Sequence, residues 1–399
     1  MRSKYNLLTA LCVIASIPLV WHLLNREMAA SSIPVVRIAS FNAALNRPEP
    51  GQLLEELRGG GCEQARQIAE IVQRNGIDVL LLCELDRDDA AASAAVFADE
   101  YLAVSQNGAA PIRFDFRFVG EVNTGEPSGV DLDGDGNIGG PGDAYGYGAF
   151  PGQYGMALFS RHPILVDEIR TFRELPWMSM PEAVRPDGFY TEAAWAKMRL
   201  SSKSHWDVPV GVAGKRIHVL CSHPTPPVFD GPEDRNGCRN HDEIRFWVDY
   251  LTPEKSGWIV DDKGVAGGLA EGVDFVLLGD LNCDPVDGEG LQDALRALLA
   301  HPRIQDPEPR SDGGAEESTR EWGVNASQKG DPALDTGDFE DVPGKGPGNL
   351  RVDYVLVSRS LGVDGEGVFW PLDYMDTRKL EDASDHRLVW VDVLVPPEG

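Results

Sequence analysis

The most constraining feature of this sequence is a series of short apolar runs that each end near a polar or acidic residue. The clearest run covers residues 273–278 (VDFVLL) and leads directly into GDLN at 279–282. A run of four to eight mostly apolar residues bounded by turn residues is typical of a strand buried on both faces. Similar runs recur between residues 35 and 395 without a repeat of fixed period. The pattern therefore predicts a sheet-rich core whose strands end in polar side chains.

The sequence pattern predicts more strands than helices. Residues 63–75 carry apolar side chains at helical spacing and end at Asn75-Gly76, a typical C-cap. Helices are also expected at 241–250 and 291–299, and strands at 195–200 and 215–222. Residues 107–152 are rich in Gly, Asp, Tyr and Pro, which predicts a long inserted loop. No linker divides the chain, so we expect one domain over residues 31–399.

Residues 1–30 have the composition of a targeting segment. A basic start is followed by an apolar stretch from Leu7 to Leu24 and by small residues near position 30. This order predicts a signal peptide, with an uncleaved N-terminal membrane anchor as the alternative. We therefore expect an exported protein, periplasmic or extracellular.

The net charge and the cysteine content narrow the class of protein. A formal charge of −28 argues against DNA binding through a broad basic face. It does not exclude a nucleic acid substrate, because a metal ion can dominate the field within a Debye length. Six cysteines are too few for a disulfide scaffold. Cys62 and Cys238 lie in polar or Gly-rich segments and are the best candidates for a disulfide pair.

Polar residues at the predicted strand ends are candidates for a catalytic site. Asp, Asn, Glu and His are the residues that hold Mg²⁺ or Ca²⁺ and that move protons at a phosphate ester. A charged group where a strand leaves the core is costly without a partner, which indicates a cation or a reacting group nearby. The candidates are Asn42, Glu84, His223, Asp280, Asn282, Asp353, Asp385 and His386.

The order and local context of these residues resemble those of the endonuclease/exonuclease/phosphatase (DNase I-like) family. The matching segments are SFN (40–42), CEL (83–85), YGMALFSRHPI (154–164), SHP (222–224), GDLN (279–282), RVDYVLVS (351–358) and SDHR (384–387). The resemblance spans residues 35–395. It implies an α+β fold, a four-layer α/β/β/α sandwich of two mostly antiparallel sheets with helices outside.

The resemblance also implies a role for each residue. Glu84 is the expected metal anchor, because a hard cation prefers carboxylate oxygen, and the resemblance adds Asn42 and Asp385 as ligands. The expected ion is Mg²⁺, with Mn²⁺ or Ca²⁺ as alternatives. Asp280 and Asn282 are two residues apart, so an extended chain points both to one face, where they would orient water and hold phosphate.

Two histidines complete the implied catalytic set. Asp353 is the family-matched carboxylate that would orient His386 and raise its pKa. His223 would lie on the far side of the phosphorus. Whether Asp280 or His386 removes the proton from water stays open at this point.

Three further residues are candidates for phosphate contact. Arg161 follows a Ser-Arg step shared with the family, with a structural ion pair as the alternative. Arg239 and Asn240 lie near the start of a predicted helix, whose N-terminus can receive an anion.

A separate motif at residues 131–137 (DLDGDGN) is similar to the first half of an EF-hand loop. It predicts a structural Ca²⁺ site, with a plain acidic turn as the alternative, because Gly142 stands where the bidentate Glu is expected. The expected ligands are Asp131, Asp133, Asp135 and Asn137.

Together these observations predict a secreted, Mg²⁺-dependent phosphoesterase that cleaves phosphodiester bonds, like a nuclease, by direct attack of water. The alternatives are a phosphomonoesterase or a sphingomyelinase-like lipid-headgroup hydrolase, and an inactive binding module. The expected partner is a phosphate ester in a nucleic acid, a phospholipid headgroup or a small molecule. We expect a monomer.

Overall fold

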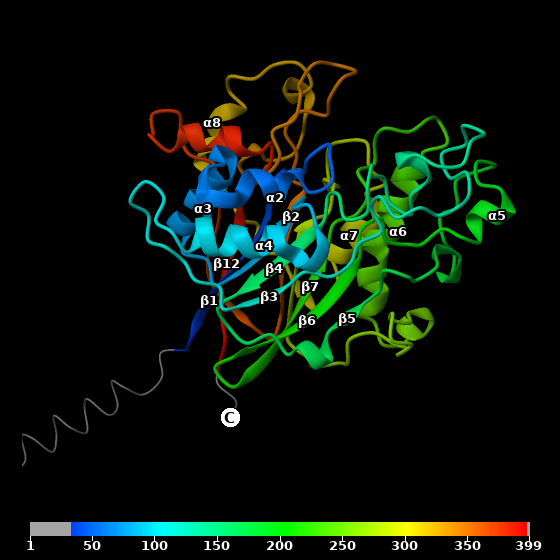
Figure 1. Cartoon of the computed structure of the whole chain (residues 1–399), viewed down its shortest axis with the longest axis horizontal. Coiled ribbons are helices and arrows are strands. Elements are labelled where there is room, and N and C mark those ends of the chain that lie inside the picture. Colours follow the sequence, from blue (N-terminus) through cyan, green and yellow to red (C-terminus); the bar gives the residue numbers. More distant parts are fainter. Residues whose placement is uncertain (1–32, 397–399) are drawn as a thin grey trace, which may run out of the picture.

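Two six-stranded mixed sheets form the centre of the protein in a computed structural model that describes residues 33–396 (Figure 1). The first sheet has the order β11-β12-β1-β2-β4-β3 and the second β5-β6-β7-β8-β10-β9. Most neighbouring strands are antiparallel, and the pairs β1–β2 and β7–β8 are parallel. The strands are β1 Val35–Asn42, β2 Val79–Cys83, β3 Phe116–Phe118, β4 Met156–Ser160, β5 Arg170–Thr171, β6 His205–Val212, β7 Lys215–Ser222, β8 Phe275–Asp280, β9 Ile304–Gln305, β10 Asp353–Ser358, β11 Gly362–Val368 and β12 Val389–Leu394.

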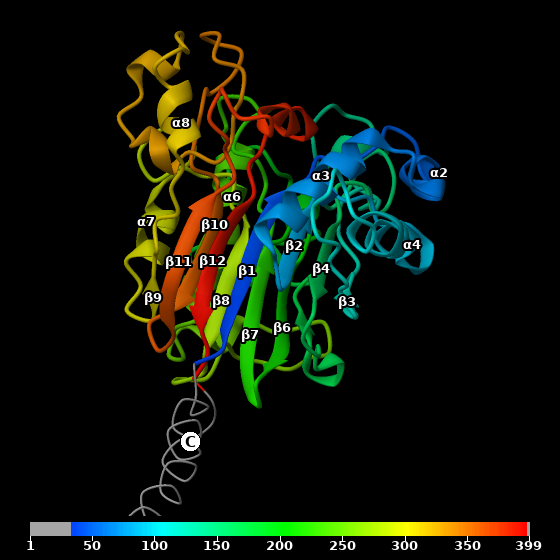
Figure 2. The same ribbon diagram turned by 90° about the vertical axis from the view of Figure 1, so that its left-hand side faces the viewer.

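Helices cover the outer faces of the two sheets, which confirms the four-layer sandwich (Figure 2). Helices α3 and α4 lie on the side of the first sheet, and α6 and α7 on the side of the second. The α-helices are α2 Gln52–Leu57, α3 Glu63–Asn75, α4 Ala92–Val96, α5 Glu192–Trp195, α6 Arg235–Tyr250, α7 Asp293–Leu299 and α8 Asp312–Glu317. The predicted helix at 63–75 is confirmed, and Gly76 ends it with a φ of 64°.

The apolar runs are buried on both faces because each strand lies between two hydrophobic layers. In β8, Val276 and Leu278 point into the core between the sheets, whereas Phe275 and Leu277 point toward α6 and α7. Side chains alternate along a strand, so a strand in this position must be apolar at every residue. Such a strand cannot place a polar residue until it leaves the core, which locates the candidate site at the strand ends.

Two predictions about local structure are corrected. Residues 195–200 are not a strand: Trp195 ends helix α5, whose N-cap Thr191 accepts a hydrogen bond from the Ala194 N–H. The disulfide between Cys62 and Cys238 is wrong, because both thiols are free. Cys62 packs against the core outside the first sheet and Cys238 lies in the core outside the second, so both sheets separate them.

The predicted leader, residues 1–30, lies outside the described part of the chain. Within residues 33–396, no helix combines the length and the apolar character that crossing a bilayer requires.

Asp335, in the long loop before β10, is a buried carboxyl surrounded by other acids. Burial, together with the charges of Asp284, Asp287, Asp331 and Glu321, raises its pKa from 3.8 to about 8. The folded protein therefore binds this proton more tightly than the unfolded chain between pH 4 and pH 8. Stability contributed by the protonated carboxyl is present at low pH and is lost as the pH rises through this window.

We expect Asp335→Asn to increase the free energy of unfolding at pH 8 and to change it little at pH 4. A pKa shift of this size corresponds to at most about 5 kcal/mol at pH 8. Urea unfolding at both pH values measures the difference, with Asp376→Asn, an exposed acid, as the control. If the substitution changed the free energy of unfolding equally at both pH values, the pKa of Asp335 would not be raised in the folded protein.

Candidate active site

Polar residues from both sheets meet at one end of the sandwich. Figure 2 shows β1 running toward the end where α8 and the long loops gather. Asn42 is the last residue of β1 and lies beside Cys83 of the parallel strand β2, which brings Glu84 next to it. In the second sheet, Asp280 at the end of β8 pairs directly with Asp353 at the start of β10. We call Asn42, Glu84, His223, Asp280, Asp353 and His386 the strand-end cluster.

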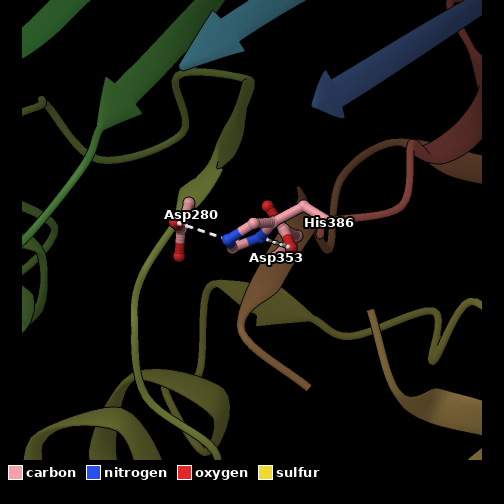
Figure 3. A group of neighbouring side chains, drawn as sticks. All are labelled: Asp280, Asp353 and His386. Carbon is pink, nitrogen blue, oxygen red and sulfur yellow. Dashed lines mark hydrogen bonds and ion pairs between the residues drawn. The ribbon is translucent and has the colours of Figure 1, made fainter. Parts of the chain in front are cut away.

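Asp353, His386 and Asp280 form a chain of contacts at the centre of this cluster (Figure 3). Nδ1 of His386 lies 2.8 Å from Oδ2 of Asp353, and its Nε2 lies 3.7 Å from Oδ2 of Asp280. The backbone N–H of His386 donates to Ser384 Oγ (3.0 Å), and that hydroxyl donates to the carbonyl of Asn42 (2.7 Å). The loop before β12 is thereby tied to the end of β1, which holds the imidazole over the second sheet.

The pKa values of the two histidines in the strand-end cluster are shifted in opposite directions. Burial by itself lowers the pKa of His386, but the charges of Asp353 and Asp280 outweigh it and raise this pKa above its usual range. The pKa of His223 is held well below its usual range by burial and by the positive charges of Lys203 and His386. The surroundings therefore favour the cationic form of His386 and the neutral form of His223, and this difference suits the two imidazoles to different proton-transfer roles.

Asp280 lies between the two histidines and accepts hydrogen bonds from the first sheet. Its Oδ2 accepts from Asn42 Nδ2 (3.0 Å) and lies 3.5 Å from Nε2 of His223. Its Oδ1 accepts from the backbone N–H of Asn282 (2.9 Å). Burial raises the pKa of Asp280, and the positive charge of His386 opposes that increase. The side chain of Asn282 donates to the carbonyl of Pro224 (3.1 Å), beside His223.

Glu84 provides a second carboxylate at the mouth of the cluster. Its oxygens accept from Asn42 Nδ2 (3.2 Å) and from Asn46 Nδ2 (2.8 Å). Burial raises the pKa of Glu84, against the opposing charges of His386 and Lys203. The backbone at Glu84 has a φ of 59°, a conformation that costs energy in a non-glycine residue and is often found at functional sites.

The donor atoms of the cluster fit a divalent cation. Among residues 33–396, no Lys or Arg nitrogen lies within 4.0 Å of the carboxylates of Glu84, Asp280 or Asp353. Oxygen and imidazole ligand atoms of Asp280, Asp353 and His386 lie within 4.8 Å of one another. Within the described part of the chain, Asp280 and Asp353 have histidines as their only close ion-pair partners, and Glu84 has no ion pair within 4.0 Å. These carboxylates provide an excess of negative charge, and hard oxygen donors are the ligands that Mg²⁺ and Ca²⁺ select.

Asp385 and Arg161, two other predicted site residues, are not members of the strand-end cluster. Asp385 is an exposed residue outside the close group of Asp280, Asp353 and His386, although its negative charge acts on Asp353 and His386. Arg161 follows β4, which runs antiparallel to β2 with Met156 beside Cys83 and Ser160 beside Val79. Arg161 is therefore at the opposite end of the sheet from Glu84. It forms an ion pair with Asp78 (2.7 Å), the structural alternative considered for it.

Arg239 and Asn240 are buried and hold loops together. The guanidinium of Arg239 donates to four backbone carbonyls, those of Tyr145, Arg199, Leu200 and Ser201. Nδ2 of Asn240 donates to the carbonyls of Thr225 (2.8 Å) and Leu281 (2.9 Å). Both residues lie inside helix α6, which begins at Arg235 and not at its predicted start, so neither lies at a free helix N-terminus.

The acidic loop that begins at Asp131 brings two acids of the EF-hand-like motif close to Asp143, a residue outside that motif. Carboxylates of Asp131 and Asp133 lie within 4.8 Å of Asp143, whereas Asp135 is outside this group of acids; the expected ligand Asn137 stays a prediction. Asp143 is buried and accepts from the backbone N–H groups of Leu132 and Gly139, both at 2.7 Å. The Ca²⁺ assignment stays a prediction, and the acids that the fold brings together are Asp131, Asp133 and Asp143.

Lys203 is a site residue that sequence reasoning missed. It is 6% exposed and faces the strand-end cluster, with Glu243, Glu84 and Asp280 as its nearest negative charges. Burial lowers its pKa, and these acids oppose the decrease. The surrounding segment, SSKS, has no apolar period or motif that marks a buried lysine. Only the position of the loop before β6 brings this ammonium to the site.

Helix α6 positions that loop. Oε1 of Glu243 accepts from the backbone N–H of Ser202 (2.6 Å), and its Oε2 accepts from that of Thr225 (2.6 Å). The buried carboxylate of Glu243 therefore fixes both Ser202, next to Lys203, and Thr225, two residues after His223.

A cleft with a volume of about 720 Å³ opens beside Glu84 and Lys203. Its walls come from the predicted loop insert, from the loop after β7 and from the start of α6. Glu84 is the member of the strand-end cluster that lines this cavity, which is large enough for a small organic molecule.

Two face-to-face mixed sheets thus bring a His–Asp pair and two further carboxylates together at one end of the sandwich. A sequence model of the endonuclease/exonuclease/phosphatase family matches residues 39–386, and the chain belongs to that family. Members of this family are hydrolases that act on phosphoesters.

Solved structures that are similar to this chain include a protein of the same family. An endonuclease/exonuclease/phosphatase protein from Beutenbergia cavernae is 19% identical, with a TM-score of 0.51 over 91% of this chain and 72% of that one. Sphingomyelinase C from Streptomyces griseocarneus is 18% identical (TM-score 0.45; 90% and 99% covered). A mannosyl-6-phosphatase from Bacteroides thetaiotaomicron is 14% identical (TM-score 0.44; 90% and 99% covered). A comparison with curated proteins finds no match.

Proposed function

We propose that this protein is a metal-dependent phosphodiesterase that hydrolyses its substrate by direct attack of water. The observation that carries the proposal is the contact chain Asp353–His386–Asp280, which lies next to Glu84 and Lys203 at the end of a cleft. A buried cationic histidine, a neutral histidine and a carboxylate of raised pKa around one point are suited to proton transfer at a phosphate ester.

Glu84 and Asn42 would hold the cation, and Mg²⁺ is the ion proposed for their oxygen donors. When bound, the ion supplies charge stabilisation to phosphoryl oxygens. The hydrogen bond from Asn46 to Glu84 orients the carboxylate of the expected anchor.

The other residues would divide the proton transfers and the phosphate contacts. Asp280 is the proposed general base, because its raised pKa lets a carboxylate accept a proton near neutrality. His386, kept protonated by Asp353, would donate to a phosphoryl oxygen. His223, on the other side of Asp280, would contact the leaving oxygen, and Asn282 would help to hold the phosphate.

An assay against several phosphoesters tests this function. The purified protein is incubated with Mg²⁺, Mn²⁺ or Ca²⁺ and with an aryl phosphodiester, an aryl monoester, plasmid DNA or sphingomyelin. Metal-dependent cleavage of the diester is expected. Faster cleavage of the monoester or of sphingomyelin would instead assign the phosphomonoesterase or the lipid-headgroup hydrolase. Lack of turnover with every substrate and every metal would favour a binding module.

We expect Glu84→Ala to raise the Mg²⁺ concentration for half-maximal activity by at least about tenfold, because an anionic ligand is lost. The fold should be retained, since Glu84 lies outside the hydrophobic clusters. Activity is measured over a Mg²⁺ titration, with Glu55→Ala on the exposed face of α2 as the control. An unchanged titration curve would remove Glu84 from the metal site.

We also propose that the protein is exported through its N-terminal segment. Cell fractionation followed by N-terminal sequencing of the mature chain tests this proposal and separates a cleaved leader from an anchor.

A further inference from the structure

Among residues 33–396, the cleft beside the strand-end cluster has one uncommitted cation. Three basic residues line it: Lys203, Arg235 and Arg239. The guanidinium of Arg239 is occupied by backbone carbonyls, and that of Arg235 pairs with Glu233. Among the described residues, Lys203 has no hydrogen-bond acceptor and no acid within 4.0 Å. A buried ammonium without a partner is costly, which indicates that an anion enters here.

The number of free cations limits the charge of the occupant. A polynucleotide places a phosphate at every nucleotide, and proteins that follow such a strand provide a groove with several basic groups. This cleft offers one free ammonium beside Glu84, the proposed anchor of a single cation, and its lining also includes the carboxylate of Asp133. The charges therefore fit a substrate with a single phosphate group.

The rest of the lining fits a flat organic group. Two strongly exposed aromatic rings line the cleft from different loops: Tyr147 from the insert and Phe229 from the loop after β7. Aromatic rings stack on planar groups, so the two rings favour a ligand with a flat ring system.

We propose that the substrate is a small phosphodiester that carries one phosphate and a ring-containing group about the size of a nucleoside. Tyr147 and Phe229 are its specificity-determining residues. The inference rests on the proposed function, because it takes the strand-end cluster as the site that receives the phosphate. It adds that the enzyme selects single small molecules and not polymers.

Calorimetric binding tests the cleft independently of turnover. The full-length protein with Mg²⁺ is titrated with thymidine 5′-monophosphate, methyl phosphate and octathymidylate. We expect the nucleotide to bind about tenfold more tightly than methyl phosphate, the gain expected from one stacked ring. Octathymidylate should bind no more tightly than the mononucleotide.

Substitutions of the two aromatic residues test whether their rings bind the ring of the ligand. In Tyr147→Ala and in Phe229→Ala, the ratio of the two affinities should fall toward one. Tyr374→Ala, an exposed tyrosine outside the cleft lining, should keep the native ratio. Equal binding of the nucleotide and methyl phosphate by the native protein, or tighter binding of octathymidylate, would overturn the inference.

A separate measurement distinguishes this inference from the proposed function. Turnover of methyl 4-nitrophenyl phosphate with Mg²⁺ reports on the strand-end cluster. Turnover without nucleotide preference would leave the function intact and refute the substrate class. Nucleotide preference without turnover would refute the function and leave the cleft as a binding site for nucleotide-sized phosphates.

Discussion

Replacing His386 with alanine is expected to lower kcat by about 10²–10⁴-fold, the range observed when a group that transfers protons is removed. The imidazole connects Asp353 to Asp280 and is the nearest positive charge to both carboxylates. Its removal leaves two buried acids without their cation and removes the proposed donor to the phosphoryl oxygen. Steady-state kinetics on an aryl phosphodiester at saturating Mg²⁺ measure the loss.

Two further variants show whether the effect belongs to the site. Asp353→Asn keeps the imidazole but removes the charge that keeps it protonated, so a loss of similar direction is expected. His162→Ala changes a histidine at the opposite end of the first sheet and should retain native kcat. If His386→Ala retained folding and lost less than about tenfold in kcat, His386 would not be a catalytic residue.

Lys203→Met is expected to lower kcat/KM by about 10²–10³-fold, comparable to the loss of one preorganised donor to a developing oxyanion. The Lys203 residue is 6% exposed, its ammonium has no ion-pair partner within 4.0 Å among the described residues, and it lines the same cleft as Glu84. The same substitution should leave the melting temperature unchanged or raise it, because methionine removes an unpaired buried charge at similar volume.

A lower kcat/KM together with an unchanged or higher melting temperature would show that Lys203 acts in function and not mainly in stability. A lysine that mainly stabilised the fold would lose stability on replacement and keep kcat/KM in the folded fraction. Lys197→Met, on the exposed surface just after α5, is the matched control and should change neither quantity. Native kcat/KM in the Lys203 variant would remove this residue from the site.

Much of the fold follows from local patterns in the chain. A strand between two apolar layers must be apolar at every position, so β2, β8 and β10 are visible as uninterrupted runs. Helix α3 is equally clear, because its apolar spacing and its C-cap glycine agree. The polar residues that follow such runs mark Asn42, Glu84 and Asp280 as candidates before any tertiary contact is known.

Other features depend on which strand ends meet, and no local pattern contains that information. Arg161 follows an apolar strand just as Glu84 does, yet β4 runs in the opposite direction to β2 and carries Arg161 to the far end of the sheet. Cys62 and Cys238 both lie near helix starts, yet two sheets stand between them. Asp143 joins Asp131 and Asp133 only because the loop closes on itself.

The sequence by itself determined the family, the members of the strand-end cluster and the strands that are buried on both faces, such as β2, β8 and β10, since such burial leaves a direct signature in the residues. The tertiary structure alone decided the cleft, the position of Lys203 and the role of α6. These features arise from loops whose composition is polar and irregular, and their contacts depend on strand order, strand direction and the buried Glu243 that joins two loops.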